Sequence, residues 1–219
     1  MKKSTILVLL AALILPLIAS CTMIIPSGVI VERDYYFQNF DSVVVSSSFN
    51  ATITPNSVSS TRILIDQAAA DYLDVHQIGT TLYLGLQPGA MISGDFQLQA
   101  NIAMPALTSI NASGASTISA NNFNPPSLFV DISGASTGIL GNISITQGNL
   151  VVSGASTLRS TGNTSVSSST VNVSGASTLR IPVLNYASGS VSGASTFVYG
   201  MYGPTINVNV SGASSCRPF

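Results

Sequence analysis

The stretch SGASTLRSTGNTSVSSSTVNVSGASTLR, residues 153–180, contains the string SGAST twice, beginning at Ser153 and at Ser174. The same string recurs through the second half of the chain, and only its last copy is altered, to SGASS. The opening serines of the six copies are Ser113, Ser133, Ser153, Ser174, Ser192 and Ser211. Recurrence at a nearly fixed period is typical of a repeat architecture, so we interpret the string first as a structural unit.

Apolar and polar residues alternate on the N-terminal side of every copy. The position directly before the first serine is occupied by Ala112, Ile132, Val152, Val173, Val191 and Val210. The position three residues before it is occupied by Ile110, Val130, Leu150, Val171, Gly189 and Val208. Between them stands a mostly polar column of Asn111, Asp131, Val151, Asn172, Ser190 and Asn209. Alternation with a period of two predicts a half-buried β-strand.

A second apolar position follows the string and predicts a second strand in each repeat. It is occupied by Ile118, Leu158, Leu179 and Phe197, and we expect Gly138 to displace it to Ile139 in the second copy. In the string itself, glycine can adopt a positive φ at a tight corner. We expect the neighbouring alanine to face inward and the Ser and Thr hydroxyls to bond backbone groups at the corner.

The repeat period, together with two strands in each unit, predicts an all-β parallel β-helix, or β-solenoid, with coils of about 20 residues. Its coils would stack at about 4.8 Å and pair strand to strand. Helical repeats, the main alternative, need long segments with the apolar period of a helix, and no such segment follows residue 101. One coil alone cannot bury enough apolar surface to offset the entropy of ordering it, so stacking must stabilise the array.

The part of the chain before the repeats is built differently. Residues 40–55, 60–67 and 80–86 read as strands, and residues 67–73, QAAADYL, as a short helical turn. We expect this part to form irregular first coils with degenerate corners, which cover the end of the strand stack. An uncovered parallel edge would invite strand addition from another chain.

The N-terminus has the pattern of a secretory signal, with Lys2 and Lys3 ahead of an apolar run. Residues 18–21, IASC, resemble a bacterial lipobox. This resemblance implies cleavage after residue 20 and a lipid anchor, with acyl groups such as palmitate, at Cys21. With Thr22 following the cysteine, it favours the outer membrane within the cell envelope. We expect residues 21–38, which contain Pro26 and Gly28, to tether the lipid to the fold.

Removal of residues 1–20 leaves five arginines against eight acidic residues, a formal net charge of −3. A chain so poor in basic residues lacks the positive surface that nucleic-acid binding requires. The expected partners are therefore the membrane, through the lipid, and a glycan or an envelope protein.

Several segments together resemble a known bacterial family. They are FDSVVV (residues 40–45), LDVHQIGTTLYLGL (73–86), MPALTSINASGAST (104–117) and the recurring SGAS. They are similar to the head GIN domain of auto-transporter adhesins over about residues 39–214. The resemblance implies a right-handed β-helical fold over residues 39–219, with its SGAS repeats at 113–214, and a cell-surface or periplasmic setting. It carries no catalytic or ligand-binding residues to this chain.

The sequence offers no catalytic constellation. Residues 134–138, GASTG, match the pattern of a nucleophile elbow, but His76 is the only histidine and precedes it, whereas the elbow requires a later one. Asp131 is the only acidic residue beyond Asp95, so a paired-carboxylate site is not expected in the repeats. We predict no enzyme activity, no cofactor and no metal site, and we expect the column of Asn111 to hydrogen-bond along the stack.

The remaining prediction is that the outer face of the repeats binds a ligand. Arg159 and Arg180 fall in one column of the repeat with Arg217, and the first two could grip a sulfate or a sugar acid. Cys216 falls in an apolar column and is expected to be a small buried side chain. We therefore predict a non-enzymatic envelope adhesin or surface-interaction protein. The alternatives are a structural spacer or assembly element and a stacked threonine array, at 117, 137, 157, 178 and 196, that binds a polysaccharide or ice.

Overall fold

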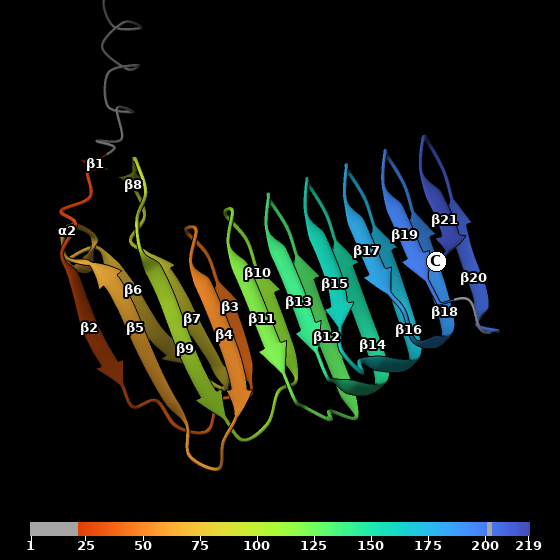
Figure 1. The fold of residues 1–219 in the computed structure, drawn as a ribbon, viewed down its shortest axis with the longest axis horizontal. Coiled ribbons are helices and arrows are strands. Elements are labelled where there is room, and N and C mark those ends of the chain that lie inside the picture. The colour runs from red at the N-terminus through yellow and green to blue at the C-terminus, as the bar shows by residue number, and fades with distance from the viewer. Residues whose placement is uncertain (1–21, 201–202) are drawn as a thin grey trace, which may run out of the picture.

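The computed structural model describes residues 22–200 and 203–219. The expected signal peptide, residues 1–20, and the expected lipidation residue, Cys21, lie outside the described residues. Within them the chain is almost entirely β, and its strands stack side by side along one long axis (Figure 1).

Each repeat contributes one strand to each of two sheets. The strands before the SGAS corners are β10 (Ser109–Ala112), β12 (Ser127–Ile132), β14 (Ser144–Val152), β16 (Ser165–Val173), β18 (Leu184–Val191) and β20 (Thr205–Val210), in sheet 1. The strands after the corners are β11 (Thr117–Asn121), β13 (Thr137–Gly141), β15 (Thr157–Thr161), β17 (Thr178–Ile181), β19 (Thr196–Tyr199) and β21 (Ser215–Pro218), in sheet 2. All neighbours in these two series pair in parallel, which confirms the predicted β-solenoid.

The repeat register is kept through every coil. Thr117, Thr137, Thr157, Thr178, Thr196 and Ser215 are successive pairing partners, so the threonine column exists as expected. The expected shift at the second copy is wrong, because Gly138 pairs with Ile118 on one side and Leu158 on the other. Ile132 and Leu158 fill the space beside Gly138, so Ile139 stays on the outer face.

The N-terminal part also forms coils, but not in the order of the sequence. One coil consists of β3 (Ser42–Val45) and β4 (Asn50–Pro55), and another of β7 (Thr81–Leu86) and β9 (Leu98–Met104). The β3–β4 coil lies between the β7–β9 coil and the first SGAS coil, because β3 pairs with both β7 and β10 and β4 with both β9 and β11. Its corner, Ser46–Phe49, is the degenerate corner that we expected: Ser47 aligns with Gly114 and has a φ of 61°.

Antiparallel strands cover the N-terminal end of the stack. They are β2 (Ile30–Tyr35) and β5 (Ser60–Asp66) in sheet 2 and β6 (Leu73–Ile78) in sheet 1, with the short helix α2 (Gln67–Ala70) between β5 and β6. A small two-stranded sheet of β1 (Thr22–Ile24) and β8 (Ala90–Ile92) projects beside them (Figure 1). The range expected to form a tether, 21–38, therefore contains the paired strands β1 and β2.

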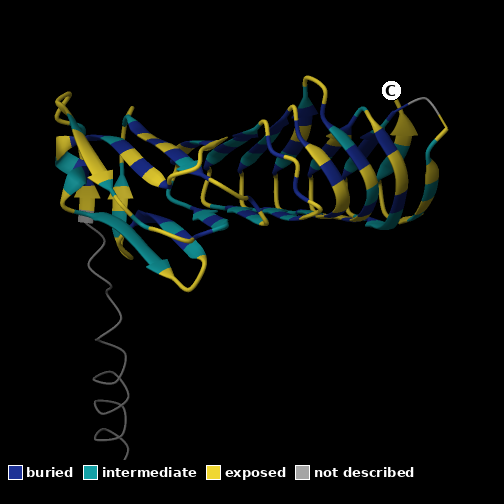
Figure 2. Cartoon of the chain, turned by 90° about the horizontal axis from the view of Figure 1, so that it is seen from below, coloured by how far each residue is buried: buried dark blue, intermediate teal, exposed yellow. Residues whose placement is uncertain are grey.

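The core fills the space between the two sheets along the whole axis. Buried and exposed residues alternate along the strands and produce the stripes of Figure 2. Most inward positions are Val, Ile, Leu or Ala, and Phe40, Phe49 and Phe197 are among the largest fully buried side chains. Cys216 continues the apolar column of Phe197 as expected, but it is half-buried and not buried as predicted, because it lies in the last coil of the described stack.

One buried carboxylate ties the N-terminal segment to this core. Asp66 accepts hydrogen bonds from the backbone N–H and the hydroxyl of Ser27 (3.0 and 2.7 Å) and from the backbone N–H groups of Gly28 and Ala68 (both 2.9 Å). Burial alone would raise the pKa of Asp66, but these hydrogen bonds favour the charged form and lower its pKa to about 2. Asp66 thus caps α2 and also fixes the chain between β1 and β2.

Candidate interaction surface

The SGAS corners are built so that coils can approach closely. The glycine of each copy has a positive φ, between 64° at Gly114 and 81° at Gly193. A Cβ on Gly212 would lie only 2.7 Å from the carbonyl oxygen of Gly193 in the preceding coil. A Cβ on Gly154, Gly175 or Gly193 would lie even closer to the carbonyl oxygen of the equivalent glycine in the preceding coil. Glycine is therefore required at these corners both for its backbone conformation and for its lack of a side chain.

The second serine of each string, rather than the alanine, points into the molecule. The first alanine, Ala115, and its equivalents lie at the exposed corners, which makes the expected inward alanine wrong, whereas Ser116, Ser136, Ser156, Ser177 and Ser195 are buried. The backbone N–H of each serine donates to the Oγ of the serine in the next coil. The successive pairs are Ser116–Ser136, Ser136–Ser156, Ser156–Ser177, Ser177–Ser195 and Ser195–Ser214, at 3.2 to 3.4 Å.

This serine ladder explains why the string is repeated so strictly. At the corner tip the chain leaves one sheet for the other, and the serine N–H turns away from the regular ladder of backbone bonds. A hydroxyl is small enough to sit inside and still accept that N–H, which a buried alanine could not do. Of the predicted bonds between Ser and Thr hydroxyls and backbone groups at the corner, those of the serines are confirmed.

Asparagines have a comparable role at the opposite edge of sheet 2, and this role was not predicted from the sequence. Asn122 and Asn142 have positive φ values of 63° and 52°, and Gly162 follows them in the next coil. The side-chain amide of Asn142 donates to Asn122, and its Oδ1 accepts the backbone N–H of Asn163 (3.0 Å). The signal was the Asn-Asn, Gly-Asn and Gly-Asn pairs at residues 121–122, 141–142 and 162–163.

The asparagine column on sheet 1 is less regular than expected. Its members are aligned, but Asn111 donates to Ser109 in its own strand (3.2 Å) instead of to the next coil. A side-chain hydrogen bond between coils does occur further along the column, where Ser190 donates to Asn172 (3.1 Å). Asp131 is half-buried there, and burial raises its pKa. The side-chain hydrogen bonds that continue from coil to coil are instead those of the serines and asparagines at the two edges of sheet 2.

Arg159 and Arg180 lie side by side on the outer face of sheet 2. They are pairing partners of β15 and β17, so their backbones are about 4.8 Å apart. Both are exposed, and the guanidinium of Arg180 lies over the ring of Phe219, 4.1 Å from its centroid. Within the described residues neither guanidinium forms an ion pair with a carboxylate. Two adjacent like charges repel, and a bridging anion would relieve that repulsion.

These arginines belong to a single row that crosses every strand of sheet 2. The pairing partners along it are Asp34, Arg62, Asn101, Thr52, Ser119, Ile139, Arg159, Arg180, Val198 and Arg217. We call it the arginine row. Only the part within the repeats was predicted from the sequence, because Asp34, Arg62 and Asn101 lie on strands outside the repeats.

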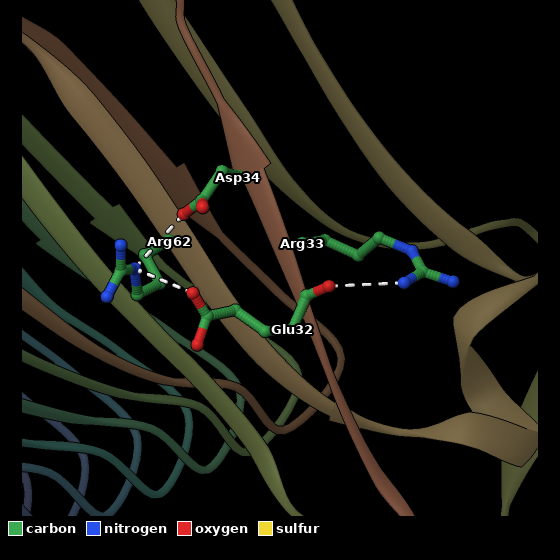
Figure 3. A network of polar contacts seen from close by, with 4 residues as sticks. All are labelled: Glu32, Arg33, Asp34 and Arg62. Atoms are coloured by element: carbon green, nitrogen blue, oxygen red, sulfur yellow. Dashed lines mark hydrogen bonds and ion pairs between the residues drawn. The ribbon is translucent and has the colours of Figure 1, made fainter.

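A shallow groove of about 380 Å³ lies at the N-terminal end of the arginine row. Asp34, Tyr36, Thr52, Arg62 and Asn101 are among its lining residues. Figure 3 shows the ion pairs at its edge: the Nε of Arg62 contacts Glu32 at 3.1 Å and Asp34 at 3.0 Å. The hydrogen bond to Asp34, followed by the negative charges of Asp34 and Glu32, raises the pKa of Arg62. Tyr36 is highly exposed and offers a flat aromatic face beside these polar groups.

The GASTG segment does not form a nucleophile elbow. Ser136, the serine of the GASTG segment, is buried and its Oγ accepts the N–H of Ser116. His76 lies in β6, where its Nδ1 contacts Asp74 (2.8 Å) and its ring stacks on Tyr83 at 5.0 Å. Residues 22–200 and 203–219 contain no group of three or more His, Cys, Asp or Glu side chains that could hold a metal ion.

The fold is a β-solenoid with a regular outer face. The family model described as "Putative auto-transporter adhesin, head GIN domain" matches residues 39–196, and the chain belongs to this family. The resemblance seen in the sequence is thereby confirmed.

Several solved structures have the same fold. The chain is similar to a "putative adhesin" from Bacteroides fragilis, with 16% identity, a TM-score of 0.73 and coverage of 90% of this chain and 100% of that one. It is also similar to a "putative lipid binding protein" from Parabacteroides distasonis (13% identity, TM-score 0.66, 90% and 100%). A "putative adhesin" from Parabacteroides merdae is a further neighbour (12% identity, TM-score 0.56, 90% and 99%). These likenesses show the fold.

No curated protein matches this chain significantly. The family and two of these three neighbours are described as adhesins, and the third neighbour as a lipid binding protein. The family description suggests a surface or envelope protein. In the described part of the chain, none of the helical segments has the length and apolar character that crossing a bilayer requires.

Proposed function

We propose that this protein is a non-enzymatic, lipid-anchored adhesin of the cell envelope that binds an extended anionic glycan along the arginine row. The observation that carries the proposal is the pairing of Arg159 with Arg180, unneutralised by any carboxylate of the described residues, in a row that ends in the polar groove. Sugar acids and sulfates are the anions that a polysaccharide presents to such a site.

The spacing of the row supports a polymer as the ligand. Three strand steps separate Thr52 in the groove from Arg159, a span of about 14 Å, and a short oligosaccharide is long enough to cover it. Guanidinium groups bind carboxylate and sulfate oxygens with two parallel hydrogen bonds, and Tyr36 can stack on a sugar ring. The hydroxyls of the threonine column lie next to this path.

The anchor and the location are part of the same proposal. The lipobox at residues 18–21 supports lipidation of Cys21, and Thr22 supports the outer membrane as the destination. A domain held at a membrane and equipped with repeated polar groups suits attachment, because many weak contacts along one polymer add up.

A binding screen tests the proposal. The chain from residue 22 onward is applied to an array of neutral, carboxylated and sulfated glycans and of matrix proteins. Binding to acidic glycans that Arg159→Ala and Arg180→Ala each weaken is the expected result. Arg33→Ala is the matched control, because Arg33 is exposed on β2 and its Nη1 donates to the carbonyl of Glu32. Equal loss with the control variant, or no binding to any member of the array, contradicts the proposal.

The C-terminal coil favours a second candidate, an element that assembles end to end. In the described structure β20 pairs with β18 alone, and Val210 is 46% exposed although the corresponding residues of earlier coils are buried. A second copy could cover this end. Analytical ultracentrifugation decides the matter: a monomer at all concentrations contradicts assembly, whereas a dimer that Val210→Lys dissociates supports it.

A further inference from the structure

An apolar face on the small β1–β8 sheet has no protein partner within the described chain. Side chains alternate along β1, so that Ile24 is buried in the core while Met23 and Ile25 are 67% and 71% exposed. Met91 of β8, the pairing partner of Met23, is 53% exposed. We call Met23, Ile25 and Met91 the apolar face.

The surroundings of the apolar face are uncharged. Residues 22–31 and 86–94, which supply both strands and their flanks, contain no Asp, Glu, Lys or Arg. Exposed large apolar side chains elsewhere in the described chain occur mostly singly, such as Val58 between β4 and β5 and Ile78 at the end of β6. A contiguous apolar group rimmed by polar residues is the usual sign of a binding surface.

The position of the apolar face singles out a lipid bilayer as its occupant. β1 begins at Thr22, the residue directly after the cysteine of the lipobox, and Figure 1 shows the β1–β8 sheet projecting from the body of the solenoid. A lipid on Cys21 would hold this sheet within a few ångströms of the membrane surface. Long apolar side chains without neighbouring charge enter the interfacial region of a bilayer readily.

We propose that the apolar face inserts into the membrane interface next to the lipid anchor and fixes the N-terminal end of the solenoid against the bilayer. This inference rests on the lipid anchor of the proposed function. The β1–β8 sheet thereby acts as a second membrane contact, which restricts the orientation of the solenoid at the bilayer.

Site-specific fluorescence in vesicles tests the proposal. The full chain is purified in its membrane-processed form, carried in a Cys216→Ser background, and reconstituted into phosphatidylcholine and phosphatidylethanolamine vesicles. Met23→Cys, Met91→Cys and Val58→Cys variants are each labelled with an environment-sensitive dye. Val58 is the matched control, because it is 63% exposed but lies in the connection between β4 and β5, at the far end of those strands from the β1–β8 sheet (Figure 1).

We expect a blue-shifted emission at positions 23 and 91 that spin-labelled lipids quench, and no quenching at position 58. Position 91 is decisive, because it is remote from Cys21 in the sequence and reaches the membrane only through the fold. Substitution of Met23 and Ile25 by serine should then reduce the quenching at 91, whereas Ile78→Ser should leave it unchanged.

Three results would overturn the inference. Lipid on Cys21 in the intact mass with an unquenched probe at 91 refutes the membrane contact but leaves the anchor standing. Absence of lipid on Cys21 refutes the anchor and this inference together. A blue shift at 91 that grows with protein density and is not quenched by the labelled lipids shows instead that a second copy covers the apolar face.

Discussion

Substitution of Gly175 by alanine should separate the two reasons for glycine at the SGAS corners. Gly175 has a φ of 79°, and an alanine in this left-handed region costs about 1–2 kcal/mol. The added Cβ would also collide with the carbonyl oxygen of Gly154 in the preceding coil. That oxygen accepts the N–H of Ala176 (2.7 Å) and the hydroxyl of Ser177 (3.2 Å).

The collision adds a second cost to the backbone strain. If the coils move apart enough to clear the Cβ, these two hydrogen bonds weaken, at about 1 kcal/mol each. The total expected loss is therefore about 3–4 kcal/mol. Gly79→Ala is the control, because Gly79 has a φ of 58° but nothing within 4 Å of the added Cβ, so it carries the backbone cost alone.

Urea unfolding of the chain from residue 22 onward, followed by circular dichroism, measures both variants. The reasoning requires Gly175→Ala to lose clearly more unfolding free energy than Gly79→Ala. Equal losses would show that coil spacing adapts to a methyl group, and that glycine is present for its φ alone.

Three further outcomes follow from single side chains. Ser156→Ala removes the acceptor of the buried N–H of Ser136 and should cost about 1–3 kcal/mol in the same assay, with Ser153→Ala, at the corner entrance, nearly neutral. Because the pKa of Asp66 is lowered from 3.8 to about 2 on folding, its contribution to stability is complete above about pH 5 and is lost progressively as the pH falls through its folded pKa of about 2; urea midpoints of Asp66→Asn should lack that part of the acid decline. Burial raises the pKa of the Cys216 thiol, so a disulfide reagent at pH 8 should react slowly with the native chain and rapidly in urea, and a fast native reaction would contradict the half-buried placement.

The repeated half of the fold could be predicted from the sequence because each coil has the same sequence pattern. Alternation predicted the strands, and the spacing of SGAST predicted the register that places Arg159 beside Arg180. The sequence pattern could not predict that the serine at each corner points inward and the alanine outward. Alanine and serine are similar in size, and only the unpaired N–H at the corner selects the hydroxyl for the interior.

The N-terminal half was less predictable because its strands pair with partners distant in the sequence and contain no recurring sequence motif. Neither alternation nor turn residues reveal that β9 lies between β4 and β5, or that Asn101 and Arg62 extend the arginine row. Residues 22–35 contain Pro26 and Gly28, which are typical of a linker, yet the hydrogen bonds from Ser27 and Gly28 to Asp66 hold that segment in place. Local composition carries no information about an acceptor so distant in the sequence.

The position of the β3–β4 coil has a consequence for the order in which the chain can fold. A chain synthesised from its N-terminus makes β3 and β4 before their neighbours in the stack, because residues 81–104 on one side and 109–121 on the other come later in the sequence. The chain up to Met104 therefore has to close as one block with many long-range contacts before the first SGAS coil has an edge to pair with, and such closure is a slow kind of event. The later coils each need only the coil before them and can add one at a time, so we expect closure of the block to limit the rate at which the whole solenoid folds.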